Sequence, residues 1–409
     1  MLHSKLKTLF LAAFVILLAL ALISFPKESL EASIRGLDMW WKVVFPSLLP
    51  FFIVSELLIG FGVVKFIGVL LEPLMRPLFR VPGVGGFVWA MGLASGFPAG
   101  AKLTSRLYQE KQLTKVEAER LVSFTNASNP LFIFGAISVG FFHNPAVGLV
   151  LAISHYLGNF CVGLMMRFYG PNELPKKNDK KSIIVVIREA LRTLHHTRLN
   201  EKRPFGKLLG DAVSSSIQTL LMVGGFIILF SVFTRLLSLV NISDGIAFIL
   251  SSFLLVLGIS PELSIPLISG LFEITSGSEM ASQTKEASLL NQIMITSFIL
   301  GFSGLSVQAQ VASILAETKI GFKPFFVGRI FQGFLAAFFT FLLWKPLYIN
   351  IEATIERGNI IAVLAKPTTH SWLFSIWNVF LETGPILTIM SLLLYILIYA
   401  FRLKLVGRK

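Results

Sequence analysis

The sequence predicts an all-α polytopic membrane protein with about eight transmembrane helices plus two re-entrant helical hairpins in an inverted repeat. Three observations lead to this fold class. The 409 residues are 54% hydrophobic and 14% charged, with a mean hydropathy of +0.76, a composition that ordinary soluble domains do not have. Apolar runs of roughly 20 residues, the length that crosses a bilayer, recur along the chain. The second half also repeats a polar pattern of the first at a distance of 174 residues, and internal repeats are typical of secondary transporters.

Eight apolar runs are long enough to be spans. In chain order they are Leu9–Phe25, Val43–Gly60, Ser123–Phe142, Pro145–Met166, Ser216–Leu239, Leu290–Leu315, Phe325–Trp344 and Leu373–Phe401. The first run follows Lys5 and Lys7 and in this respect resembles a signal peptide. Its bulky end, Ile23-Ser24-Phe25, fits a small-residue cleavage site poorly, so we expect an uncleaved first helix.

Two further apolar stretches, 84–101 and 264–285, are interrupted by Gly, Pro and Ser. Each follows a shorter apolar or amphipathic run, 63–79 and 246–259, that ends at a proline turn. The two arrangements occupy the same place in each half of the chain. An interfacial helix followed by a re-entrant hairpin accounts for both.

These elements divide the chain into five segments. They are an N-terminal helix with an external loop (1–42), repeat 1 (43–169), a basic cytoplasmic linker (170–209), repeat 2 (210–348), and an external loop with a C-terminal helix (349–409). For the linker, a solvated loop near anionic lipid is favoured over a protein-docking site. The helix expected at 110–120 carries i,i+4 charge pairs and is interpreted as an exposed cytoplasmic helix.

The distribution of basic residues predicts the orientation. If the amino terminus is cytoplasmic, 27 of the 36 Lys and Arg residues fall in loops assigned inside and 7 in loops assigned outside. Such a bias places both termini in the cytoplasm. It also makes the two halves antiparallel, so that one hairpin enters from each side of the membrane.

One polar patch lies inside an apolar span, at Thr125-Asn-Ala-Ser-Asn-Pro130. Proline removes a donor and frees a carbonyl one turn earlier, and in hydrocarbon such groups must bond to protein, water or a solute. The patch therefore predicts a helix that is broken at a binding site. The matching stretch in the second half, 297–312, carries Ser303, Ser306, Gln308 and Gln310.

The candidate substrate-binding residues come from the two hairpins and the two broken helices. They are Ser95, Gly96, Asn126, Ser128, Asn129, Glu273, Thr275, Ser276, Ser303 and Ser306. A half-helix that begins after a hairpin turn aims unpaired N–H groups and a positive dipole end at the membrane centre, where an anion is stabilised. Two alternatives stay open: a Gly-rich packing surface in the first hairpin, and an external loop that leaves Glu273 solvated.

Several functions are excluded or disfavoured. The chain contains no HExxH, GxSxG or Walker A motif, and its single cysteine, Cys161, lies within a span, so we expect no enzyme activity, metal site or cofactor. The basic residues lie in loops between spans, which argues against nucleic acid as a partner. Glu56, His155, Asn159 and Arg329 are interpreted as intramembrane hydrogen-bonding residues, and Arg329 occupies the repeat position that matches His155.

Three motifs carry a resemblance to a known family. The hairpin Gly92–Lys102, the cluster Ser123–Pro130 and the stretch Gly301–Ser306 resemble the YlbJ-type sporulation integral membrane proteins, which carry a nucleoside-recognition gate domain and are related to concentrative nucleoside transporters. The resemblance covers nearly the whole chain. The acidic nucleoside-binding signature expected of a nucleoside carrier is absent from the sequence.

The resemblance implies a transporter that moves dipicolinic acid from the mother cell toward the forespore, in the outer forespore membrane, and it implies a trimer. Dipicolinate is a flat dianion, and hydroxyls, amides and half-helix ends suit carboxylates. The alternatives are a nucleoside or other small-metabolite transporter of the gate type, a structural or assembly factor of the spore envelope, and a channel in place of a carrier. A coupling ion, Na⁺ or H⁺, is left open. Lys102, near the cytoplasmic end of the first hairpin, is a candidate for helping the anion to enter.

Overall fold

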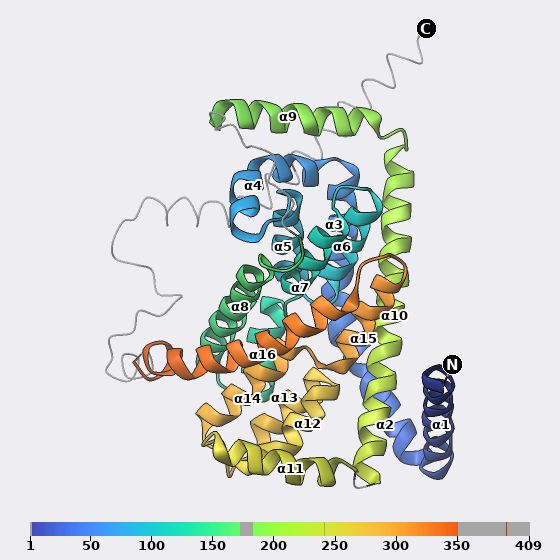
Figure 1. The fold of residues 1–409 in the computed structure, drawn as a ribbon, viewed down its shortest axis with the longest axis vertical. Coiled ribbons are helices and arrows are strands. Elements are labelled where there is room, and N and C mark those ends of the chain that lie inside the picture. The colour runs from blue at the N-terminus through green and yellow to red at the C-terminus, as the bar shows by residue number, and fades with distance from the viewer. Residues whose placement is uncertain (1, 172–182, 241, 351–389, 391–409) are drawn as a thin grey trace. The chain divides into compact units, whose positions relative to one another are not determined.

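The computed structural model describes residues 2–171, 183–240, 242–350 and 390, and within these residues every regular element is a helix. The predicted span Leu373–Phe401 lies outside the described residues. The chain divides into two units, Met1–Asn350 and Ile351–Lys409, and the helices with described bounds all belong to the first. Figure 1 shows the helices of this unit in chain order.

The elements of the first half begin with two helices ahead of the predicted repeat. In order they are α1 (Leu2–Ser24), α2 (Pro26–Met39), the π-helix η1 (Trp40–Val44), α3 (Phe45–Gly60), α4 (Val63–Phe79), α5 (Val84–Ser95), α6 (Ala99–Gln109), α7 (Lys115–Thr125), the π-helix η2 (Leu131–Phe141) and α8 (Ala146–Met166). Helix α9 (Ile183–Asn200) lies between the halves.

The second half repeats the order of elements. It contains α10 (Phe205–Leu239), α11 (Ile242–Val256), the 3₁₀-helix η3 (Pro261–Leu263), α12 (Ser264–Phe272), α13 (Ile274–Gln283), α14 (Leu289–Phe302), α15 (Gly304–Ala316), α16 (Phe322–Trp344) and the π-helix η4 (Lys345–Ile349). Each half thus has a short apolar helix, a helical hairpin, a broken helix and a long helix. The short helices α4 and α11 lie at opposite ends of the unit in Figure 1.

The membrane architecture is confirmed in its coarse form. Among the described residues, four helical stretches are long and apolar enough to cross a bilayer: α8, α10, the α14–α15 pair and α16 with η4. The number rises to six if two bent pairs each count as one span, with bends of 102° between α1 and α2 and 81° between α3 and α4. The predicted count of eight stays a prediction.

Both predicted hairpin regions fold as two helices joined by a tight turn. In the first hairpin, α5 and α6 both pack on the end of α7. A Cβ atom on Gly92 would lie 2.0 Å from the Thr125 carbonyl oxygen, and one on Gly100 would lie 2.3 Å from the same atom. In the second hairpin, a Cβ on Gly277 would lie 2.2 Å from the Cα of Gly270. Only glycine permits these approaches.

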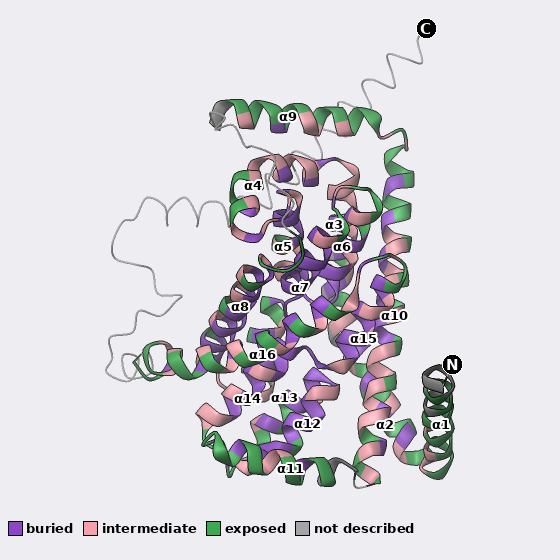
Figure 2. Ribbon diagram, in the orientation of Figure 1, coloured by how far each residue is buried: buried purple, intermediate pink, exposed green. Residues whose placement is uncertain are grey.

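Buried residues gather where the hairpins meet the broken helices, and exposed residues follow α1, α9 and α11 (Figure 2). The core includes stacked aromatic rings, with the Phe79 and Phe124 centroids 4.7 Å apart. Apolar side chains along the outer helices remain exposed, as expected where lipid is the solvent.

Two amphipathic helices replace segments that the sequence pattern assigned to loops. Helix α2 occupies the predicted external loop, with Pro26 in its first turn, a position where the missing N–H costs nothing. Helix α9 occupies the predicted cytoplasmic linker and packs on α4. Both helices are rich in charged residues, which hid their helical periodicity behind a low mean hydropathy.

The helix expected at 110–120 is corrected in position and exposure. Helix α7 begins at Lys115 behind a capping box formed by Thr114 and Glu117. The predicted i,i+4 pair of Lys115 with Glu119 forms at 3.8 Å, but Glu117, Glu119 and Arg120 are buried and not exposed. These side chains bond to Arg76 of α4, to Tyr169 after α8 and to Gly321 before α16.

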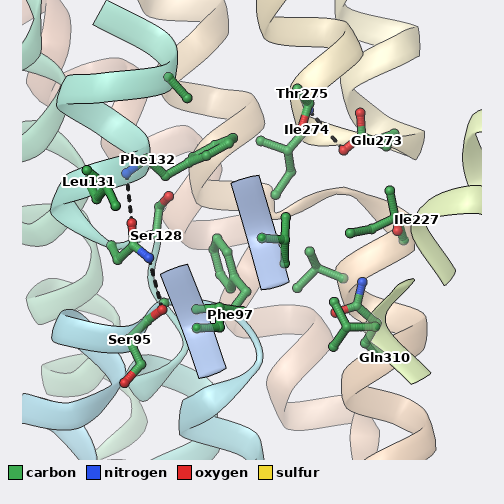
Figure 3. Close-up of a pocket in the computed structure, with 18 of the residues that line it drawn as sticks. Ser95, Phe97, Ser128, Leu131, Phe132, Ile227, Glu273, Ile274, Thr275 and Gln310 are labelled. Carbon is green, nitrogen blue, oxygen red and sulfur yellow. Dashed lines mark hydrogen bonds between the residues drawn. The ribbon is translucent and has the colours of Figure 1, made fainter. Parts of the chain in front are cut away.

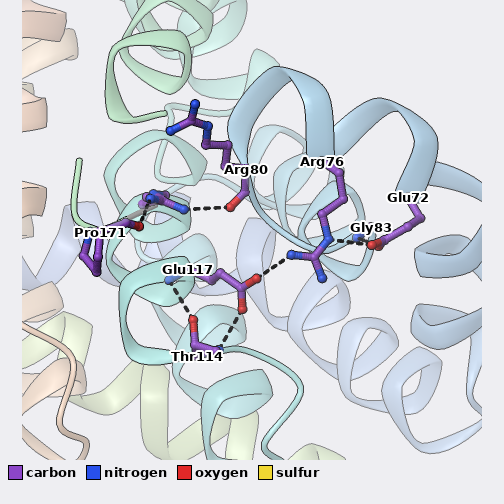
Figure 4. A network of polar contacts seen from close by, with 8 residues as sticks. Glu72, Arg76, Arg80, Gly83, Thr114, Glu117 and Pro171 are labelled. Carbon is purple, nitrogen blue, oxygen red and sulfur yellow. Dashed lines mark hydrogen bonds and ion pairs between the residues drawn. The ribbon is translucent and has the colours of Figure 1, made fainter. Parts of the chain in front are cut away.

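A polar network holds this end of the unit together (Figure 4). Arg76 on α4 bonds to Glu72 and to Glu117, both at 2.6 Å. Arg120 donates to the main-chain carbonyls of Arg80 and Tyr169 at 3.0 and 2.7 Å. Glu72 also accepts from the Gly83 N–H directly before α5. The network therefore ties the base of the first hairpin to its neighbours, so any movement of that hairpin is expected nearer its tip.

Candidate functional site

A cavity of about 560 Å³ lies where the hairpin turns meet the broken helices (Figure 3). Its walls come from the start of α3, the tip of the first hairpin, the first broken helix, α10, the start of α13 and α15. The lining residues are Lys42, Val44, Pro46, Leu48, Ser95, Gly96, Phe97, Ser128, Asn129, Leu131, Phe132, Gly135, Ala136, Val223, Ile227, Glu273, Ile274, Thr275, Ser306, Val307 and Gln310. Both halves of the chain therefore contribute to one site.

Seven of the ten candidate residues line this cavity and three do not. The lining members are Ser95, Gly96, Ser128, Asn129, Glu273, Thr275 and Ser306, whereas Asn126, Ser276 and Ser303 are not among the lining residues. Asn126 and Ser303 are fully buried. The Asn126 side chain bonds to main-chain groups at the first break, whereas the Ser303 hydroxyl has no hydrogen-bond partner within the described residues.

The first broken helix is interrupted between α7 and η2, as the Asn-Ala-Ser-Asn-Pro sequence predicts. The Asn126 side chain accepts from the Ala101 N–H at the start of α6 and donates to the Val122 carbonyl, both at 3.0 Å. The Asn129 side chain donates to the Ser95 carbonyl at 3.0 Å and accepts from the Phe132 N–H at 2.7 Å. These two amides therefore close helix ends in the hairpin as well as in the broken helix.

Residues of α8 and α16 complete the bonding at this break. The Nε2 atom of His155 accepts from the Ser128 N–H, and the Tyr156 hydroxyl donates to the Ser128 carbonyl, both at 3.0 Å. The Arg329 guanidinium donates to the carbonyls of Ser123 and Asn126. The interpretation of His155 and Arg329 as residues that bond between helices agrees with these contacts.

The second broken helix, α14–α15, turns on a single residue. Ser303 has a left-handed backbone with φ of 68°, which L-residues other than Gly seldom adopt. The Gln308 side chain donates to the Phe302 carbonyl at 2.9 Å. The hydroxyls of Ser303 and Ser306 have no hydrogen-bond partner within the described residues, and neither does the Ser95 hydroxyl at the tip of the first hairpin.

Glu273 lies at the turn of the second hairpin, where its side chain caps α13. One carboxylate oxygen accepts from the Thr275 N–H at 3.0 Å and the other from the Ser276 N–H at 2.7 Å. Glu273 is only 8% exposed, so the alternative of a solvated external residue is not what the structure shows. Capping offsets the cost of the buried charge because the helix start carries a partial positive charge.

Lys42 and Glu273 are the charged residues among those that line the cavity. Lys42 is largely exposed and pairs with Asp38 at 2.9 Å. Lys102, the sequence's candidate for anion entry, instead pairs with Glu56 of α3 at 3.5 Å and lies 5.0 Å from the centroid of the Phe52 ring. No cluster of three metal-ligating side chains occurs among the residues whose positions are described.

The sequence interpretation missed the apolar walls. Phe97 and Phe132 line the cavity from the first hairpin and the first broken helix (Figure 3), and Ile274 and Val307 line it from the second half. Phe97 stands between Gly96 and Pro98, a turn signal that gave no indication of its side chain's direction. Flat apolar walls with hydroxyl and amide groups at their edges suit a planar solute with polar substituents.

The chain is similar to known proteins over nearly its whole length. The nucleoside-recognition Gate family matches residues 41–187 and 220–320. The sporulation integral membrane protein YlbJ of Bacillus subtilis (strain 168) is 57% identical over 401 residues, which cover 98% of each chain. An uncharacterized protein of Alkalihalophilus pseudofirmus is 32% identical over 124 residues, 30% of this chain and 25% of that protein. No solved structure matches this chain.

Proposed function

Because the chain belongs to the gate-domain family of YlbJ-type sporulation integral membrane proteins, we propose that it is a membrane transporter for a small anionic solute, and that the solute is dipicolinate. The cavity shared by two hairpins and two broken helices is the observation that carries the proposal. Irregular backbone at membrane depth is tolerated where it lines a cavity, and secondary transporters bind solutes at such breaks.

Dipicolinate fits the chemistry of the cavity walls. Its aromatic ring suits the apolar Phe97 and Phe132 side chains, and its carboxylates suit the hydroxyls of Ser95 and Ser306, which have no partner among the residues that the structure describes. Helix α15 begins beside the cavity without a side-chain cap, so its N–H groups and positive dipole end favour a carboxylate there. Glu273 opposes an anion, although its charge is partly offset by the two N–H groups that it accepts.

The repeated element order supports an inverted repeat as part of the proposal. In this arrangement the two hairpins approach the membrane centre from opposite sides, and both termini are cytoplasmic. The hairpin tips shift against the long helices to open the cavity to each side in turn. By resemblance, the membrane is the outer forespore membrane, the direction is from mother cell to forespore, and the oligomer is a trimer.

Export from a non-sporulating bacterium that synthesises dipicolinate tests the function. Cells that produce this protein should release dipicolinate into the medium faster than cells with an empty vector. The matched control is a strain that makes the protein but not dipicolinate. Its release of other metabolites reports leakage caused by the membrane protein itself. Equal release with and without the protein, at verified membrane abundance, would reject dipicolinate as the solute.

A nucleoside is the second candidate solute, favoured by the nucleoside-recognition description of the matching family. Uridine uptake in the same host distinguishes the two candidates. If the solute is a nucleoside, cells that produce the protein should take up uridine, and uridine should inhibit any transport of dipicolinate. A structural or assembly factor of the spore envelope is the remaining alternative. It predicts that neither solute moves while spores that lack the protein are malformed.

A further inference from the structure

Arg329 is a fully buried cation that faces main-chain carbonyls and not an acidic side chain. It lies on α16, is 0% exposed, and donates from Nη1 to the Asn126 carbonyl and from Nη2 to the Ser123 carbonyl. Its guanidinium lies over the Phe325 ring, 5.4 Å from the centroid. Arg329 forms no ion pair within the described part of the chain. A buried charge without a counter-charge is costly, which indicates a specific use.

The carbonyls that Arg329 binds belong to the carboxyl end of a half-helix. This end carries the negative pole of the α7 dipole, and the break removes the intrahelical donors for its last carbonyls. In secondary transporters built on broken helices, such carbonyls coordinate the coupling Na⁺. Here the guanidinium bonds to two of them, and Gly92 and Gly100 crowd a third, the Thr125 carbonyl.

We infer that the Arg329 guanidinium is the resident cation of the first broken helix: it takes the place of a coupling Na⁺ and provides positive charge that makes the cavity prefer anions. The first clause stands on the contacts alone. The second clause rests on the proposed function. It explains how an anion can bind in a cavity that is lined by the acidic Glu273 and by Lys42, which is exposed and already paired with Asp38.

The distance is short enough for this effect. Asn126, whose carbonyl Arg329 binds, is two residues from Ser128 in the cavity wall, and successive Cα atoms are about 3.8 Å apart. The guanidinium is therefore within roughly 12 Å of the wall. At an effective dielectric constant of about 20, a fixed charge at that distance changes binding by on the order of tenfold for each unit of solute charge.

Arg329 and His155 occupy matching positions in the two halves of the chain. The position that matches Arg329 in the first half is His155, and both side chains act on the first break, His155 on the Ser128 N–H and Arg329 on the carbonyls before it. One half thus supplies an acceptor and the other a cation to the same main-chain break. The second break, at Ser303, has no corresponding cation within the described residues.

Thermal unfolding of the purified protein in detergent tests the first clause without any transport measurement. The wild-type midpoint should be the same in NaCl and in choline chloride at equal ionic strength. Arg329→Ala should lower the midpoint, and guanidinium chloride at about 10 mM should restore part of the loss. A saturable increase of the wild-type midpoint that is specific to Na⁺, or no guanidinium effect on the variant, would overturn the resident-cation assignment.

Competition between dipicolinate and its neutral dicarboxamide tests the second clause. Binding to wild type and Arg329→Lys should favour the dianion, and the preference should fall by about tenfold or more in Arg329→Gln. Arg120→Gln is the matched control, because Arg120 also donates to main-chain carbonyls, and those of Arg80 and Tyr169 belong to residues outside the cavity lining, so the preference should be unchanged. An unchanged preference in Arg329→Gln would refute the clause. If wild type binds neither compound, the proposed solute fails while the unfolding test still decides the resident cation.

Discussion

At the first broken helix, five side chains bond to the main chain around the break: Asn126, Asn129, His155, Tyr156 and Arg329. At the second, the chain turns on Ser303, and the hydroxyls of Ser303 and Ser306 bond to nothing within the described residues. The two breaks occupy matching places in the halves. Their difference therefore lies in the side chains that surround them.

This difference separates two uses of polarity inside a membrane. A side chain that satisfies a freed N–H or carbonyl stabilises the break, because an unpaired polar group in hydrocarbon is costly. It can bind a solute only by giving up that bond. A hydroxyl without an internal partner has no such cost, so the second break is better suited to contact the solute, and the first to hold the site in shape.

The largest expected effect comes from separating the first hairpin from the first break. Gly92→Val places side-chain atoms onto the Thr125 carbonyl, which a Cβ would already approach to 2.0 Å. Because backbone must move, we expect a loss of about 3 kcal/mol or more of stability, seen as little folded protein in the membrane. Gly225→Val is the control, since a Cβ there meets nothing within 4 Å. Equal abundance of the two variants would show that the hairpin is not packed as described.

A smaller loss is expected for Asn129→Ala, which removes two bonds at the first break. The buried Ser95 carbonyl and the partly buried Phe132 N–H would lose their partner, at roughly 1–3 kcal/mol for the buried carbonyl and less for the partly exposed N–H. Stability and transport should therefore fall together, with an unfolding midpoint well below that of wild type. No local sequence pattern indicates that this amide bonds to two helix ends.

The control for that variant is Asn291→Ala, at the partly exposed start of α14. This variant should keep the free energy of unfolding within about 0.5 kcal/mol of wild type, as is usual for such positions. If Asn129→Ala instead kept wild-type stability and lost transport, the first break would be the solute-binding one and the comparison would be reversed.

Tyr156→Phe tests a single hydrogen bond at the first break. The change removes the hydroxyl that donates to the Ser128 carbonyl at 3.0 Å and leaves the ring in place. We expect a loss of about 1 kcal/mol, the usual contribution of one hydrogen bond, measured as a small decrease of the unfolding midpoint. Tyr108→Phe, on α6, provides a ring-preserving control that should show no decrease. A midpoint equal to wild type for both would mean that water replaces this hydroxyl.

The sequence predicted the elements better than the bonds between them. The apolar run Pro145–Met166 became α8 almost residue for residue, and Asn126 to Pro130 marked the first break because proline and clustered amides interrupt a helix wherever they occur. The amphipathic helices α2 and α9 were not predicted, because their low mean hydropathy resembles that of loops. The site depends on long-range contacts: the carbonyls that Arg329 binds are 203 and 206 residues away in the chain. No local pattern encodes such a pairing.

The smallest expected effect on stability belongs to Ser306→Ala, and it separates the two breaks most sharply. The Ser306 hydroxyl lines the cavity and has no partner in the described residues. Its removal should therefore change the free energy of unfolding by no more than about 0.5 kcal/mol. If the hydroxyl donates to a carboxylate of the solute, export of dipicolinate should fall about tenfold, since such bonds contribute roughly 1.5–3 kcal/mol. Ser269→Ala is the matched control: its hydroxyl on α12 is also buried and has no partner in the described part of the chain, but it lies outside the cavity lining, so export should be unchanged. Equal export by both variants would remove the second break from the solute site, whereas a loss confined to Ser306→Ala would place the solute against the second break.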